Sequence, residues 1–183
     1  MAQTSIQQSS KIQFGSGKFE ISEDGESWTN LGAMRNIVFT EEWEEVRVMS
    51  DNAGEVKRSI KNHYASLAGD LMELDLGNLN TIRGGIDSYS TDAGVSETLK
   101  SGGLKTITAI QVRVTNTNED GEDFKITIYK GYNNKGIEIT LNPDDADDPN
   151  MINVEIQGCC DTTLDEGEQL FEIYNEQGES AAS

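Results

Sequence analysis

Few side chains in this sequence have the types and spacing that catalysis requires. A hydrolytic triad needs a general base beside its nucleophile, and the one histidine, His63, lies among Lys61, Asn62 and Tyr64 on a predicted strand. An ordinary sheet or interface histidine is the simpler interpretation. Carboxylate pairs can run glycoside hydrolysis, but with 33 acidic residues some pair is always available. No nucleophile-elbow, zincin or phosphate-loop motif occurs. The sequence therefore predicts a protein that is not an enzyme and uses no cofactor.

An aspartate-rich segment is the candidate for metal binding. Asp144, Asp145, Asp147 and Asp148 stand between two prolines. Carboxylate oxygens are the ligands that calcium prefers, but this spacing departs from the EF-hand pattern. A solvated acidic loop is the simpler interpretation, and a bound calcium ion stays open as an alternative.

The two cysteines, Cys159 and Cys160, are adjacent. Neighbours on a strand point to opposite faces, so a bond between them would need a distorted turn. We expect two free thiols, as in a protein made in a reducing cytosol. A metal site needs more ligands than this pair offers, and His63 is far away in the sequence.

The elements that position these groups are mostly strands, because apolar residues recur at every second position. Turn-forming residues such as Glu23-Asp24-Gly25 separate them. Early strands are predicted around Ile12–Phe14, Lys18–Ile21 and Trp28–Leu31. Later apolar sets that share a face are Ile110, Val112 and Val114; Phe124, Ile126 and Ile128; Ile137, Ile139 and Leu141; Ile152, Val154 and Ile156; and a last strand holds Leu170, Phe171 and Ile173.

A long hairpin is predicted between residues 37 and 70. Its first strand runs into an acidic cluster at residues 41–45 with Trp43 in the middle, Ser50–Gly54 forms the turn, and Val56–Asp70 returns. An indole among four carboxylates is poorly explained by a core position alone. Trp43 therefore either anchors a contact between subunits or packs inside its own subunit.

One short helix is predicted at residues 76–84. Asp75 can cap its N-terminus, Leu76, Leu79 and Ile82 share a face, and Gly84-Gly85 supplies the positive φ of a C-terminal cap. Residues 87–103 are rich in Ser, Thr, Gly and Asp without periodicity, and we expect an exposed loop there.

These elements predict an all-β fold, a β-sandwich or barrel with one short flanking helix. We expect a flexible N-terminal arm at residues 1–10, a single domain at 11–175 and a flexible C-terminal tail at 176–183. The start of the chain lacks the features of a secretory signal, and no apolar run is long enough for a bilayer.

The charge is strongly acidic and unevenly distributed. The formal net charge is −19, and no lysine or arginine follows Lys135, although 13 of the remaining 48 residues are Asp or Glu. Binding to DNA phosphates needs basic groups that release counterions, so this surface repels nucleic acids, and anionic membranes by the same reasoning. The acidic end is either a solvated surface or one that must not hold a polyanion.

Residues 11 to about 85 contain an ordered series of motifs. The series comprises W-x-x-L-G-A-x-R at Trp28–Arg35, F-T-E-E-W at Phe39–Trp43, S-D-N-A-G at Ser50–Gly54, the basic return V-K-R-S-I-K-N, D-L-M-E-L, and L-x-x-L-N-x-I-R-G-G at Leu76–Gly85. As a set it resembles the major tail tube proteins of long-tailed, non-contractile (siphovirus-type) phages. Residues 86–183 match only in their strand-rich character.

The resemblance implies a structural virion protein, located in the phage tail and assembled in the host cytoplasm. Its copies would close into homohexameric rings that stack into a hollow, acidic tube, through which phage DNA passes without specific binding. Other partners would be the tape-measure, tail-terminator and distal tail proteins. The hairpin from Glu41 to Arg58 would bridge neighbouring copies, and its candidate interface residues are Glu41, Glu42, Trp43, Glu44, Glu45, Asp51, Asn52, Gly54, Lys57 and Arg58.

Two alternatives of a different kind stay open. One is the tube protein of a related injection or secretion machine, which would share the architecture and carry protein. The other is a β-sandwich binding module that depends on calcium at residues 144–148.

Overall fold

A computed structural model of the 183-residue chain describes residues 17–73, 75–143 and 149–176. In these ranges it contains one helix and eleven strands. The elements are β1 (Lys18–Ser22), β2 (Thr29–Asn30), β3 (Met34–Ser50), β4 (Gly54–Leu71), α1 (Leu76–Ile82), β5 (Ser88–Asp92), β6 (Ser96–Lys100), β7 (Ile110–Thr117), β8 (Asp123–Asn133), β9 (Glu138–Thr140), β10 (Met151–Gly158) and β11 (Phe171–Asn175). The predicted all-β fold with one short helix is confirmed.

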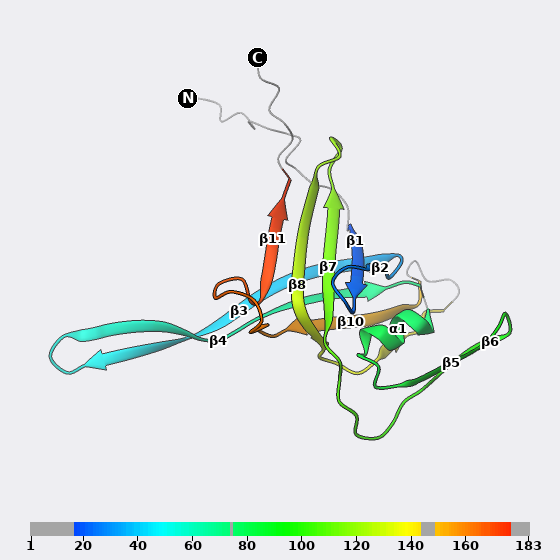
Figure 1. The fold of residues 1–183 in the computed structure, drawn as a ribbon, viewed down its shortest axis with the longest axis horizontal. Helices are drawn as coiled ribbons and strands as arrows, with labels where there is room; N and C mark the ends of the chain where they lie inside the picture. The colour runs from blue at the N-terminus through cyan, green and yellow to red at the C-terminus, as the bar shows by residue number, and fades with distance from the viewer. Residues whose placement is uncertain (1–16, 74, 144–148, 177–183) are drawn as a thin grey trace, which may run out of the picture.

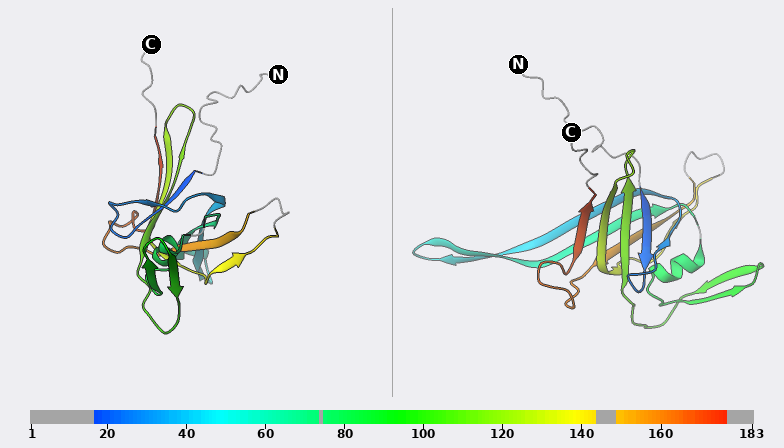
Figure 2. Two further views of the ribbon diagram at one scale, coloured as in Figure 1. Left: turned by 90° about the vertical axis from the view of Figure 1, so that its right-hand side faces the viewer. Right: turned by 45° about the horizontal axis from the view of Figure 1, so that its top comes forward.

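Nine of the strands form a single antiparallel sheet in the order β2-β1-β7-β8-β10-β4-β3, with β11 added to β8 and β9 added to β10. The sheet folds over on itself, so that β1, β7, β8 and β11 run across the direction of β3, β4 and β10 (Figure 1). Two crossed layers result, as in a sandwich with orthogonal packing. A turned view separates the upright strands from the crossing ones (Figure 2).

The corner between the layers lies where β8 meets β10, and glycines make the close approach possible. Gly131 and Gly158 are paired in register. A Cβ atom on Gly131 would lie 2.5 Å from the Cγ2 atom of Ile156, and one on Gly158 would lie 2.7 Å from that of Ile128. Side chains at these positions would push the two strands apart.

The core fills the space between the layers and follows the predicted alternation. Phe19 and Ile21 pair with Val114 and Val112, and these pair in turn with β8. All of their side chains point into the core, as residues opposite one another in a ladder share a face. The other buried apolar residues are Leu31, Met34, Ala65, Leu67, Leu71, Leu79, Ile82, Ile110, Ile128, Ile152, Val154, Ile156 and Leu170.

Helix α1 closes one end of this core. The Asp75 carboxylate accepts a hydrogen bond from the backbone N–H of Asn78 at 2.8 Å, which caps the first turn as predicted. Leu79 and Ile82 are buried in the core cluster. Gly84 and Gly85 have φ of 64° and 68°, which confirms the predicted stop signal.

The segment 87–103 was expected to be a loop, and this prediction is wrong. It contains the two-stranded sheet β5–β6, in which Ser88 pairs with Lys100 and Asp92 with Ser96. A buried ion pair between Arg83 and Asp87 ties the end of α1 to the start of β5. Arg83 also donates to the Ser101 hydroxyl at 3.1 Å, and the Lys105 ammonium donates to the Asp87 carbonyl at 3.4 Å.

Other expectations are corrected in detail. Residues 137–141 were expected to bury one face, but β9 has three residues, and Ile137, Ile139 and Leu141 are all exposed. The predicted strand at Ile12–Phe14 and the aspartates at 144–148 lie outside the described residues. Of the tail predicted at 176–183, Glu176 is described, and its backbone N–H donates to the Asp123 carbonyl at 2.8 Å.

Candidate functional site: a projecting hairpin and a polar sheet face

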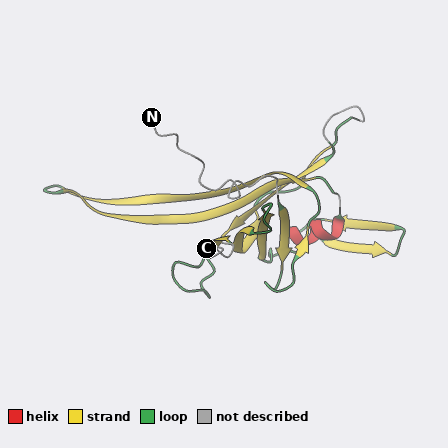
Figure 3. Ribbon diagram, turned by 90° about the horizontal axis from the view of Figure 1, so that it is seen from above, coloured by secondary structure: helices red, strands yellow, loops and turns green. Residues whose placement is uncertain are grey.

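Strands β3 and β4 extend far beyond the body of the molecule (Figure 1), on the side opposite α1 (Figure 3). We call residues 41–64 the projecting hairpin. Residues 41–49 and 51–62 are all exposed, whereas β4 is buried at alternate positions from Ala65 onward. Gly54 has a φ of 70°, as the tight turn at the tip requires. All ten residues predicted from the sequence as interface candidates therefore lie on one hairpin.

Hydrogen bonds between the strands hold the root of the projecting hairpin. The Tyr64 hydroxyl donates to Glu42 at 2.6 Å, and the Asn62 amide donates to Glu44 at 2.8 Å. The His63 ring lies 2.8 Å from a carboxylate oxygen of Glu41. The hydrogen bond from Tyr64 to Glu42 raises the pKa of the tyrosine. Most of the acidic cluster thus serves to join β3 to β4, which the sequence pattern did not indicate.

A row of aromatic rings leads from the core onto the hairpin. Phe39 packs edge-on against Phe171 of β11, with ring centroids 5.1 Å apart. His63 lies 6.3 Å from Phe171 and 6.1 Å from Trp43, again edge-on. Trp43 ends the row and is 50% exposed. Its partial exposure contradicts a core position and leaves half of its surface available to a partner.

We expect Trp43→Ala to leave folding almost unchanged and to reduce self-association sharply. The indole is half covered by its own subunit, so the free energy of unfolding should fall by about 1 kcal/mol, whereas truncation of an aromatic hot spot at an interface costs about 2 kcal/mol or more. Urea denaturation and sedimentation velocity measure the two effects. A large loss of stability with unchanged self-association would place Trp43 in the subunit's own packing.

The distal part of the hairpin has two different faces. Residues opposite one another in the ladder share a face, and the register pairs Glu45 with Ile60 and Arg47 with Arg58. On this face Arg47 and Arg58 lie 2.9 Å and 3.6 Å from Glu45. The other face pairs Glu44 with Lys61, Val46 with Ser59 and Val48 with Lys57.

A hollow of about 580 Å³ lies beneath the root of the hairpin. Its lining includes His63, Tyr64, Cys159 and Cys160, so the fold brings together groups that are far apart in the sequence. Both thiols are free, as predicted. No hydrogen bond joins either thiol to His63 in the described part of the chain. Within the described ranges, no group of three or more His, Cys, Asp or Glu side chains is arranged to hold a metal ion.

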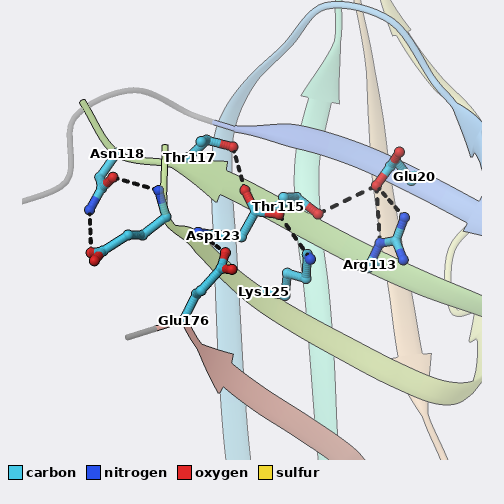
Figure 4. Close-up of polar contacts among 9 residues, drawn as sticks. Glu20, Arg113, Thr115, Thr117, Asn118, Asp123, Lys125 and Glu176 are labelled. Atoms are coloured by element: carbon cyan, nitrogen blue, oxygen red, sulfur yellow. Dashed lines mark hydrogen bonds and ion pairs between the residues drawn. The ribbon is translucent and has the colours of Figure 1, made fainter. Parts of the chain in front are cut away.

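The second polar surface is the outer face of β1, β7 and β8, away from the core (Figure 4). Arg113 donates through Nε and Nη2 to one oxygen of Glu20, at 3.0 Å and 2.8 Å, and Thr115 donates to the same oxygen at 3.4 Å. The guanidinium also lies 3.9 Å from the centroid of the Trp28 ring. The positive charge of Arg113 is therefore balanced within the subunit by Glu20.

The same pairing recurs toward the far end of this face. The Lys125 ammonium lies 2.9 Å from a carboxylate oxygen of Asp123, and Thr117 donates to that carboxylate at 2.7 Å. The hydrogen bond from Lys125 is the main cause that lowers the pKa of Asp123. Sequence reasoning missed these pairs, since they join residues brought together only by the sheet register. This face carries cations, and each of these two is matched by a carboxylate.

The described residues contain no helix long and apolar enough to cross a membrane. No protein-family model matches the chain. A search of curated proteins finds none that matches it significantly.

Proposed function

We propose that this protein is a self-assembling structural subunit, a tail tube protein whose copies form stacked hexameric rings around a passage for phage DNA. The observation that carries the proposal is the projecting hairpin, which exposes large apolar side chains far from its own core. The motif series in residues 11 to about 85, which resembles tail tube proteins, agrees with it. The hexamer and the DNA cargo come from that resemblance.

The exposed apolar surface of the hairpin needs a partner. Six apolar side chains on the projecting hairpin are between 43% and 67% exposed: Trp43, Val46, Val48, Met49, Val56 and Ile60. Single exposed apolar residues are normal, but six on a hairpin that projects from the core, spread over both of its faces, favour an interaction element. In a protein that assembles with itself, the partner for this surface is a second copy of the chain. Head-to-tail contacts between copies can close into a ring.

One edge of the sheet is also open to a partner. On one side of the layer β1-β7-β8-β11, strand β2 already pairs with β1. On the other side, β11 pairs with β8 and with no further described strand. The backbone N–H of Glu176 donates to Asp123 of β8, and along an antiparallel strand the residues that bond to the partner alternate with residues that do not. The backbone N–H and C=O groups of Phe171, Ile173 and Asn175 on β11 therefore point away from β8. Such an open edge is a hazard in a monomer.

The charge distribution supports passage of a polyanion. The net charge of −19 repels phosphate. On the outer face of the layer, Arg113 forms an ion pair with Glu20, and Lys125 forms one with Asp123. If this face lines the passage, DNA meets few free cations that would release its counterions. The conduit is then charge-paired rather than simply acidic.

Removal of the distal hairpin tests the proposal. We expect a variant in which Asn-Gly joins Glu44 directly to Lys61 to fold like the wild type, since residues 45–60 contribute nothing to the core and Asn-Gly suits a two-residue hairpin turn. Its circular dichroism and melting temperature should match the wild type within a few degrees. Negative-stain microscopy should show rings or tubes for the wild type and single subunits for the variant.

Two results would contradict the proposal. A wild-type protein that stays monomeric at high concentration and moderate salt, with tail assembly partners supplied, would remove self-assembly. Rings that form equally well without the distal hairpin would show that the hairpin is not the interface.

A further inference from the structure

One face of the projecting hairpin combines apolar residues with unpaired cations. We call Val46, Val48, Lys57 and Lys61 the lysine face. The two valines are 43% and 48% exposed. Neither lysine forms an ion pair with a described carboxylate, although Arg47 and Arg58 on the opposite face both do. Glu44 lies opposite Lys61 on this face, but it accepts its hydrogen bond from Asn62 and forms no ion pair with the lysine. In a chain of net charge −19, two lysines without an ion pair beside apolar surface favour an acidic partner.

The direction of the hairpin restricts where that partner surface lies on a second copy. The hairpin and β11 lie on one side of the molecule, and β1, β2 and α1 lie on the other (Figures 1 and 2). In a head-to-tail arrangement that repeats along the direction of the hairpin, the hairpin of one copy approaches the β1–β2 side of the next. The acidic turn between β7 and β8 is at the end of the layer, and the acidic segment between β10 and β11 is on the hairpin's own side.

The turn between β1 and β2 has the matching chemistry. Asp24 is committed to the turn itself, because its carboxylate accepts hydrogen bonds from the backbone N–H groups of Ser27 and Glu26 at 2.8 Å and 2.9 Å, which lower its pKa to about 2. Glu23 and Glu26 are exposed and have no cationic partner among the described residues. A cavity of about 250 Å³ between this turn and α1 includes Glu23 in its lining.

We propose that the lysine face of one copy docks on the β1–β2 turn of a second copy, where Lys57 and Lys61 meet Glu23 and Glu26. This inference rests on the proposed self-assembly and names its contact surface. The carboxylates bind the ammonium groups, and the valines cover the partly exposed Trp28 beside the turn. Because both charge pairs are solvent-accessible at the rim, salt weakens the contact.

A charge exchange within one chain tests the contact. Lys57→Glu with Lys61→Glu, and separately Glu23→Lys with Glu26→Lys, should each weaken self-association at least tenfold, because like charges then face one another. The chain with all four substitutions should recover assembly, since every copy then offers the reversed pair. Sedimentation velocity at several salt concentrations measures this, and Lys100→Glu with Lys130→Glu is a control with the same change of charge as the first variant.

Cross-linking gives a second readout that does not depend on variants. A zero-length carbodiimide reagent, applied to assembled mixtures of nitrogen-14 and nitrogen-15 chains, should join Lys57 or Lys61 to Glu23 or Glu26 in mixed-isotope peptides. Reversal variants that assemble like the wild type, or cross-links to other carboxylates alone, would overturn the contact while self-assembly stands. A wild-type chain that does not assemble would overturn the proposed function itself.

Discussion

Asp87→Ala should lower the free energy of unfolding by about 3 kcal/mol or more, because it leaves the Arg83 guanidinium buried without its counter-charge. The Asp87 side chain has no exposed surface, and that of Arg83 is 10% exposed. Without the carboxylate that fixes the guanidinium, the hydrogen bond from Arg83 to the Ser101 hydroxyl should weaken as well. Urea denaturation of the non-assembling hairpin-truncated chain measures the effect in a two-state system.

The pH dependence gives the prediction a second readout. The hydrogen bond from Arg83 is the main cause that lowers the pKa of Asp87 in the folded state. A lowered folded pKa means that this stabilisation is present above the unfolded pKa of about 3.9 and is lost as pH falls through the folded value. The loss of stability on acidification should therefore be smaller in Asp87→Ala than in the wild type.

Two controls separate a lost ion pair from general damage. Asp92→Ala, at the exposed end of β5, should change stability by less than about 0.5 kcal/mol. Arg83→Met with Asp87→Leu should recover most of the lost stability, because apolar residues of similar volume often replace a buried pair without loss. A small effect of Asp87→Ala alone would mean that water reaches the guanidinium.

Gly131→Ala should destabilise the fold by about 1–3 kcal/mol, since overpacking of a tight contact displaces its neighbours. The added Cβ would lie 2.5 Å from the Cγ2 atom of Ile156 and 3.3 Å from the Ile110 carbonyl oxygen. Both neighbours belong to the corner between the two layers, where β8 has little room to move. Denaturation with urea measures this loss as well.

A matched glycine gives the control for this corner. Gly136→Ala places its Cβ where nothing lies within 4 Å, so it should be neutral or slightly stabilising. In a double-mutant cycle, Ile156→Ala should relieve part of the Gly131→Ala clash. Fully additive effects would show that the two positions do not touch.

The parts of the fold that sequence could predict are those in which local and global signals agree. The hairpin of β3 and β4 combines alternation with a turn at Ser50–Gly54, and α1 combines a capping aspartate with two terminal glycines. All ten candidate interface residues lie on that hairpin because alternation and turn signal agree in this part of the sequence. Their exposure was not predictable, because alternation looks the same in a strand that is covered by the core and in one that projects beyond it.

The misses have identifiable physical causes. Strands β5 and β6 pair mostly Ser, Thr, Asp and Glu, and Tyr89 with Leu99 is their one pair of large side chains, so no apolar period marked them. Residues 137–141 have the period of a buried strand, but β9 pairs with β10 at the margin of the sheet, where nothing covers its apolar side chains. The ion pair of Glu20 with Arg113 joins positions 93 residues apart, and only the strand register brings them together.

The bulges in β3 and β4 have a consequence for how the hairpin can vary. Asn62, with a φ of 52°, lies at the register shift between Glu42 and Glu44, so one extra residue separates the side-chain pattern of the body from that of the tip. Beyond that point, adding or removing two residues on each strand changes reach while both faces keep their composition. A change of one residue on each strand exchanges the faces at the tip and leaves the core untouched. The spacing between docked copies can therefore change in steps of about 7 Å without redesign of the domain.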